Sequence, residues 1–225
     1  MNPHHFINRR TVLGYGTGLF MGGAIPNTLF AQDDYTPLNN GDWRFEIEAL
    51  GKKVGKHQVL FTRREDGQNR VETRSKVDVS LAGISVYNMQ FIAKEAWYNN
   101  DFYGLASQTL EKGKRKSLQA KREGHALVMT QNGTVKRLPN LLYPSSWWNS
   151  DVLEQSMLFD MRSGDPFRLK VTRTIVSQAP KTSLEAAKYS VEGDINLDLW
   201  FSKDKQWLAG RLKMRGQNVW YYRVS

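Results

Sequence analysis

The fold class follows from one short stretch near the start of the chain, Trp-Arg-Phe-Glu-Ile-Glu-Ala at residues 43–49. Each odd position holds an apolar side chain and each even position a charged one. Successive side chains of a β-strand point to opposite faces, so this pattern is typical of a strand with one buried and one solvated face. A similar alternation returns at residues 71–81. The sequence therefore predicts a fold built from β-strands.

Turn signals rich in Gly, Asn and Asp divide the rest of the chain into further strands. Strands are predicted through Val59 and Phe61 and at residues 71–81, 84–97, 102–110, 117–122, 126–130, 134–138, 167–175, 189–201, 207–214 and 219–224. About a dozen strands seldom form a flat open sheet, so we expect an all-β fold, either a strongly curved antiparallel meander or a barrel-like sheet. The one predicted helix is short, with Ser150 as its N-cap and Met157 near its end.

The composition fits one folded domain. Of the 225 residues, 40% are hydrophobic and 12% aromatic, which suffices for one core but not for two typical domains. Lys and Arg number 32 against 22 Asp and Glu, a formal charge of +10. With 0 Cys, disulfides, a cysteine nucleophile and thiolate metal sites are excluded. We expect a polar lead at residues 32–42 and a single β domain at residues 43–225.

Residues 1–31 have the layout of a bacterial export signal. Arg9 and Arg10 precede an uncharged, Gly-rich apolar run, and Ala31 is the best cleavage position. The arginine pair followed by Leu13 is typical of a signal that the twin-arginine export machinery reads, and an ordinary secretory signal is the alternative. The run is too short and too rich in Gly for a stable membrane span. The processed protein is therefore expected in the periplasm or outside the cell, without crossing the membrane.

Several weak motifs, taken in order, resemble one bacterial family. They are the hairpin Gly51–His57, the pair Glu95 and Trp97, the strand with Leu105, Ser107 and Thr109, the tryptophan Trp147 or Trp148 before the short helix, Tyr189-x-Val191-x-Gly193, Trp200 and Trp207. In this order they resemble the exported domain-of-unknown-function family 6134 over residues 43–224. The resemblance implies a mostly antiparallel β-protein outside the cytoplasm with no established reaction, distantly similar to the cupped sheets that carry lipoproteins or other apolar cargo.

Three polar side chains interrupt the apolar faces of predicted strands. His57, Glu95 and Arg173 each lie an even number of positions from the apolar residues of their strand, so each is expected on the apolar face. An unpaired charge on an apolar face costs stability, so such groups are paired, hydrogen-bonded or placed in a wet cavity. Two interpretations stay open: the three residues make ordinary structural contacts, or they line the polar end of a concave pocket.

Aromatic residues supply the remaining binding candidates. Trp147 and Trp148 are adjacent and cannot both point inward from one strand, so one caps the mouth of the barrel or stands exposed as a ligand platform. Trp97 is the aromatic residue that we expect to contact the apolar part of a ligand. The candidate ligand-binding residues are His57, Glu95, Trp97, Trp147, Trp148 and Arg173.

Other chemistries find little support in the sequence. Processing would leave only His57 and His125 as histidines, which is too few for a typical zinc hydrolase, and we predict no metal or cofactor. No serine stands in a Gly-x-Ser-x-Gly elbow. The basic segment at residues 112–122 has no aromatic residue for base stacking, so it indicates a solvated hairpin and no nucleic-acid partner.

These observations favour binding over catalysis. We expect an exported, soluble module that binds an apolar or amphipathic ligand such as a lipid. One alternative is an enzyme that uses His57 and Glu95, with Arg173 holding an anionic substrate, and another is a structural or interaction protein of the envelope. An apolar cavity would favour binding, contact between His57 and Glu95 an enzyme, and a filled barrel the structural role.

Overall fold

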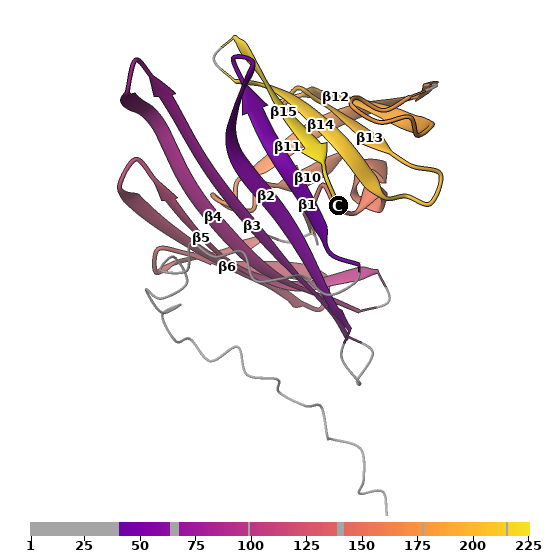
Figure 1. Ribbon diagram of the computed structural model, residues 1–225. Helices are drawn as coiled ribbons and strands as arrows, with labels where there is room; N and C mark the ends of the chain where they lie inside the picture. The colour runs from indigo at the N-terminus through magenta and orange to yellow at the C-terminus, as the bar shows by residue number, and fades with distance from the viewer. Residues whose placement is uncertain (1–40, 64–67, 99, 139–141, 177, 215) are drawn as a thin grey trace, which may run out of the picture. The chain divides into compact units, whose positions relative to one another are not determined.

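Most of the described chain is β-strand, as Figure 1 shows, and the alternation of apolar and polar residues accounts for it. This computed structural model describes residues 41–63, 68–98, 100–138, 142–176, 178–214 and 216–225. The predicted signal at residues 1–31, with Arg9, Arg10 and Leu13, lies outside the described residues, and so does the polar lead up to residue 40.

The described ranges contain 15 strands. The first eight are β1 (Trp43–Ala49), β2 (Lys52–Arg63), β3 (Gln68–Leu81), β4 (Ile84–Tyr98), β5 (Asp101–Glu111), β6 (Lys114–Glu123), β7 (Ala126–Gln131) and β8 (Thr134–Leu138). The others are β9 (Tyr143–Pro144), β10 (Met157–Phe159), β11 (Pro166–Val176), β12 (Ala186–Gly193), β13 (Leu197–Phe201), β14 (Trp207–Met214) and β15 (Gln217–Arg223).

One 15-stranded sheet joins them in the order β8-β7-β6-β5-β4-β3-β2-β1-β15-β14-β13-β12-β11-β10-β9. Paired strands are antiparallel except for β9 and β10, which pair in parallel. β1 pairs with β15 on one side and with β2 on the other. The first and last strands are therefore neighbours in the middle of the sheet.

The sheet curls until strands far apart in its order pack against each other. The rings of Phe102 in β5 and Phe159 in β10 have centroids 5.8 Å apart. The hydroxyl of Ser107 in β5 donates a 2.5 Å hydrogen bond to the carbonyl oxygen of Met161. Figure 1 shows β2–β6 as one wall and β12–β15 as another, and the main core combines residues of both. The predicted all-β, strongly curved antiparallel sheet is thus confirmed.

The predicted helix is shorter than expected. It is a 3-10 helix, η2 (Ser150–Glu154), and Met157 already begins β10. Its N-cap is Asn149, whose side chain accepts a 3.0 Å hydrogen bond from the backbone N–H of Asp151. Asn and Ser cap helices about equally well, so the sequence alone did not separate the two neighbours. Within the described ranges, no helix is long and apolar enough to cross a membrane.

One row of directly paired residues crosses five strands and positions the candidate site. Phe45 pairs with His57, which pairs with Ser75. Ser75 in turn pairs with Phe91, which pairs with Thr109. Directly paired residues of an antiparallel sheet lie on the same face, so the whole row lies on the inner face with the buried Phe45.

A close approach of β2 and β3 sets the local register. β2 contains a β-bulge at Val54, because Ile47 of β1 pairs with Gly55 and the next β1 residue, Glu48, pairs with Lys53. A Cβ atom on Gly55 would lie 2.2 Å from the carbonyl oxygen of Lys76, so only glycine fits here without moving the backbone. The register beyond Gly55 places His57 on the inner face.

Candidate functional site

The inner face of the sheet borders a cavity of about 690 Å³. The wall comes from the end of β1 and the turn after it, from β2–β4, from β13–β15 and from residues 145–148, 160–167 and 194–195. Most of its side chains are apolar, among them Val77, Met89, Phe91, Trp147, Leu199 and Trp207. Pockets that bind small molecules measure about 300–1,000 Å³ and have mostly apolar walls. This cavity therefore has the size and character of a ligand site.

β2 carries His57 into the wall of the cavity. Three rings surround the imidazole edge-on, with centroid distances of 5.6 Å to Phe45, 5.4 Å to Trp207 and 5.6 Å to Tyr221. The imidazole makes no hydrogen bond or ion pair with a described residue, and the surface that it keeps faces the cavity. Burial lowers the pKa of His57 from 6.5 to about 3, so the ring is neutral at pH 7.

Two hydroxyl side chains of β3, those of Thr73 and Ser75, share the wall with His57. Their exposed fractions are only 5% and 6%, and neither hydroxyl has a hydrogen-bond partner among the described residues. Ser75 pairs directly with His57, and Thr73 lies two residues away on the same face. The sequence pattern placed both on the apolar face of residues 71–81 but did not assign them a role. The available signal was that small polar residues stand between Val71 and Val77.

Glu95 of β4 lies outside the cavity wall, in a separate buried cluster. Its Oε2 accepts hydrogen bonds from Trp97 Nε1 at 3.0 Å and from Ser146 Oγ at 2.5 Å. Its Oε1 accepts one from Trp148 Nε1 at 3.1 Å. Burial raises the pKa of Glu95 to about 7, although the three hydrogen bonds act to lower it. Glu95 thus ties the loop around Ser146 and Trp148 to the sheet.

His57 and Glu95 share the inner face, but the structure does not bring them together. Glu95 pairs with Val71, which pairs with Phe61, four positions beyond His57 on β2. The imidazole packs against three aromatic rings, and the carboxyl group contacts its three donors. The two side chains therefore form no histidine–carboxylate couple in this structure.

The three candidate tryptophans form a layer between the cavity and the core. Trp147 and Trp148 both line the cavity. The Trp148 ring packs edge-on against Phe61 at 5.5 Å and against Trp97 at 5.4 Å. Trp97 is only 1% exposed and lies behind this contact. Of the three, Trp147 and Trp148 are in a position to touch a bound molecule.

Arg173 of β11 lies away from the cavity wall. Its side chain is exposed, and its guanidinium carbon lies 5.9 Å from the centroid of the Tyr189 ring. Across the described ranges, no group of three or more His, Cys, Asp or Glu side chains is arranged to hold a metal ion. The polar chemistry of the cavity thus comes from other residues, with His57, Thr73 and Ser75 foremost.

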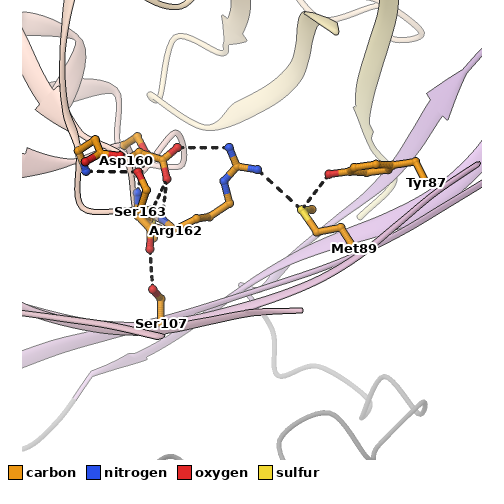
Figure 2. A network of polar contacts seen from close by, with 9 residues as sticks. Tyr87, Met89, Ser107, Asp160, Arg162 and Ser163 are labelled. Carbon is orange, nitrogen blue, oxygen red and sulfur yellow. Dashed lines mark hydrogen bonds and ion pairs between the residues drawn. The ribbon is translucent and has the colours of Figure 1, made fainter. Parts of the chain in front are cut away.

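Arg162 also lines the cavity, and Figure 2 shows its contacts. Its Nη1 lies 3.9 Å from the sulfur of Met89, which also accepts a 3.5 Å hydrogen bond from the hydroxyl of Tyr87. Its Nη2 lies 3.3 Å from Oδ2 of Asp160. Burial acts to lower the pKa of Arg162, but the charge and the hydrogen bond of Asp160 raise it overall. One carboxylate therefore balances this charge in the cavity wall.

The sequence pattern did not single out Arg162, because it stands in a turn between two strands. The Oδ1 of Asp160 accepts hydrogen bonds from the backbone N–H groups of Arg162 at 2.7 Å and Ser163 at 2.9 Å, which holds the turn. Charged residues in turns usually face water, but the Arg162 side chain points toward Met89 of β4, as Figure 2 shows.

Comparisons with known proteins place this geometry in context. The crystal structure of a β-barrel-like protein of the domain of unknown function DUF1849, from Brucella abortus, is similar with a TM-score of 0.58. The similarity covers 82% of this chain and 95% of that chain at 9% sequence identity, so it concerns the fold alone. No curated protein matches the sequence.

The family comparison covers nearly all of the sheet. The model of the family described as "Domain of unknown function (DUF6134)" matches residues 45–224, from β1 to the residue after β15. The match includes the segments quoted above for the resemblance, from the Gly51–His57 hairpin to Trp207. It also includes every strand that contributes to the cavity wall. The chain therefore belongs to the DUF6134 family of domains of unknown function.

Proposed function

We propose that this protein binds an apolar or amphipathic small molecule, such as a lipid, in the cavity of its curved sheet. The observation that carries the proposal is the cavity itself, about 690 Å³ bordered mainly by Val, Met, Leu, Phe and Trp side chains. Removing hydrocarbon from water contributes about 0.8 kcal/mol per buried methylene group. An alkyl chain or an apolar ring system placed there would therefore gain substantial binding free energy.

A cavity-filling substitution tests the proposal. We expect Val77→Trp, on the inner face of β3, to reduce the affinity for an apolar fluorescent probe at least tenfold, because the indole would occupy the space that the probe needs. The matched control is Val135→Trp, which makes the same change at an exposed position of β8. Probe titrations give the affinities, and circular dichroism checks that both variants are folded.

Two outcomes would contradict the proposal. One is a wild-type protein that binds no apolar probe, and that carries no co-purifying small molecule when native mass spectrometry is applied to protein from its own source. The other is a folded Val77→Trp variant with wild-type affinity, which would place the bound probe outside the cavity.

We also propose that the protein acts outside the cytoplasm after processing at Ala31. The support is the sequence of residues 1–31, in which Arg9 and Arg10 precede an uncharged apolar run. An envelope location suits the ligand class, because lipids and other amphiphiles are abundant in membranes and need a carrier between them.

A further inference from the structure

We infer that the ligand is an uncharged amphiphile that places a hydroxyl or carbonyl group against His57, Thr73 and Ser75. Its hydrocarbon part then lies along the apolar remainder of the wall. This inference rests on the proposed binding function and adds the chemical class of the ligand. It follows from two features of the cavity: polar groups without partners, and the absence of a free positive charge among the described wall residues.

The three polar side chains form one patch on an otherwise apolar wall. Ser75 is the cross-strand partner of His57, and Thr73 is the next residue of β3 on the same face, so the three are neighbours. Neither buried hydroxyl has a partner, and the imidazole has none among the described residues. Buried polar groups in folded proteins are nearly always hydrogen-bonded. The two hydroxyl oxygens are themselves fully buried, and rotation about the Cα–Cβ bond can turn them toward the cavity that their residues line. A ligand beside His57 would then supply the partners that the three groups lack.

The described residues of the wall offer an anionic headgroup no free countercharge. Its two arginines are each paired: Arg162 with Asp160, and Arg211 with Asp198 through Nε at 2.9 Å. Two further aspartates also line the wall: Asp165 and Asp194. A carboxylate or phosphate would lose its hydration here without gaining an unpaired cation.

The residues that surround His57 add no charge to the cavity wall. Phe45 and Trp207 carry no charge, and burial raises the pKa of Tyr221 to about 12, so this phenol stays neutral at pH 7. A neutral imidazole has one donor and one acceptor nitrogen, and each hydroxyl can donate or accept. The patch can therefore donate to a carbonyl or exchange hydrogen bonds with a hydroxyl, without ionising.

Three probes with the same twelve-carbon chain test the inference: dodecan-1-ol, dodecanoate and dodecane. Each competes with an apolar fluorescent probe for the folded wild-type protein at pH 7. We expect dodecan-1-ol to bind about tenfold more tightly than dodecane, because it meets the unpaired groups, and more tightly than dodecanoate, which must be desolvated as an anion. Dodecanoate binding as tightly as the alcohol would overturn the inference but leave the proposed function standing. Failure of all three probes to bind would overturn both.

Two variants and a matched control locate the alcohol group. His57→Phe and Ser75→Ala should each remove most of the tenfold preference for dodecan-1-ol while leaving dodecane binding unchanged. Thr134→Val, which deletes a hydroxyl at an exposed position of β8, should keep the full preference. The Ser75→Ala change is small enough to preserve the fold even if His57→Phe does not. A preference that survives both folded variants would place the polar group of the ligand elsewhere and overturn the inference.

Discussion

The imidazole of His57 is neutral because three aromatic rings take the place of the water that would solvate an imidazolium ion. Unfolding exposes the ring and returns its pKa from about 3 to the ordinary histidine value of 6.5. Between these two values the unfolded chain binds more protons than the folded one. His57 therefore reduces stability progressively as the pH falls from 6.5 toward 3.

We expect His57→Phe to remove this loss. The difference in unfolding free energy, variant minus wild type, should be about 2.5 kcal/mol larger at pH 4.5 than at pH 7, because one pKa unit corresponds to about 1.4 kcal/mol. Urea denaturation at the two pH values measures it. Burial raises the pKa of Glu95 to about 7, which makes an opposite contribution, but that contribution is common to both proteins and cancels. A difference between the two proteins that stays constant with pH would contradict a buried, neutral His57.

Alternation predicted the face of the sheet on which His57 lies, but it could not predict which residues surround the imidazole. Residues 57, 59 and 61 share a face by the period of a strand, and the register confirms this geometry. Trp207 and Tyr221, which enclose the ring, come from strands about 150 residues further along the chain. Local patterning carries no information about such contacts. The same holds for Glu95, whose partner Trp148 lies in a loop.

Among whole strands, those with a long alternating pattern were predictable and those without one were not. Residues 43–49 and 84–97 are strands as expected, because each has enough residues to show the period. β9 and β10 have only two and three residues, so no period exists to be read. The single predicted strand at residues 189–201 is in fact β12 and β13, separated at residues 194–196.

Gly55 offers a test of the strand register. We expect Gly55→Ala to lower the free energy of unfolding by about 2 kcal/mol or more, because the new methyl group would meet the Lys76 carbonyl oxygen at 2.2 Å and force β2 away from β3. Lys52→Ala, at an exposed position of the same strand, should change it by less than about 0.5 kcal/mol. Thermal or urea denaturation provides the measurement. Equal stabilities of the two variants would show that the backbone approach at Gly55 is looser than described.

At the level of the whole molecule, the sequence indicated a curved sheet and left open whether a cavity lies inside it. The wall residues Val77, Met89 and Leu199 read as ordinary core positions, since alternation shows which residues face inward and not how far the opposite wall is. Arg162 and Met89, which both line the cavity, are 73 residues apart in the chain and meet in space (Figure 2). That is a property of the three-dimensional closure, and no local segment encodes it.

The route that delivers the whole molecule to its place of action can be tested at Arg9 and Arg10. We expect the double change Arg9→Lys and Arg10→Lys to leave the protein in the cytoplasm, because the twin-arginine receptor reads the guanidinium pair and a general secretory signal needs only positive charge. Cell fractionation followed by immunoblotting measures the distribution. Arg63→Lys with Arg70→Lys, two changes outside residues 1–31, makes the matched control. Normal export of the Arg9/Arg10 variant would favour the general secretory route.

The pairing of β1 with β15 has a consequence for how the protein is made. β1 leaves the ribosome early and β15 is almost the last segment to emerge, yet the two lie side by side in the finished sheet. The chain on either side, β2–β8 and β11–β14, consists of consecutive antiparallel neighbours that can zip as hairpins during synthesis. β1 can pair with β15 only after β15 has been synthesised. This pairing closes a loop of nearly the whole domain and therefore carries the entropy cost of closing such a loop. Until translation ends, β1 and β14 each present an open edge, so a chain truncated before residue 217 would be a candidate for aggregation rather than a smaller folded protein.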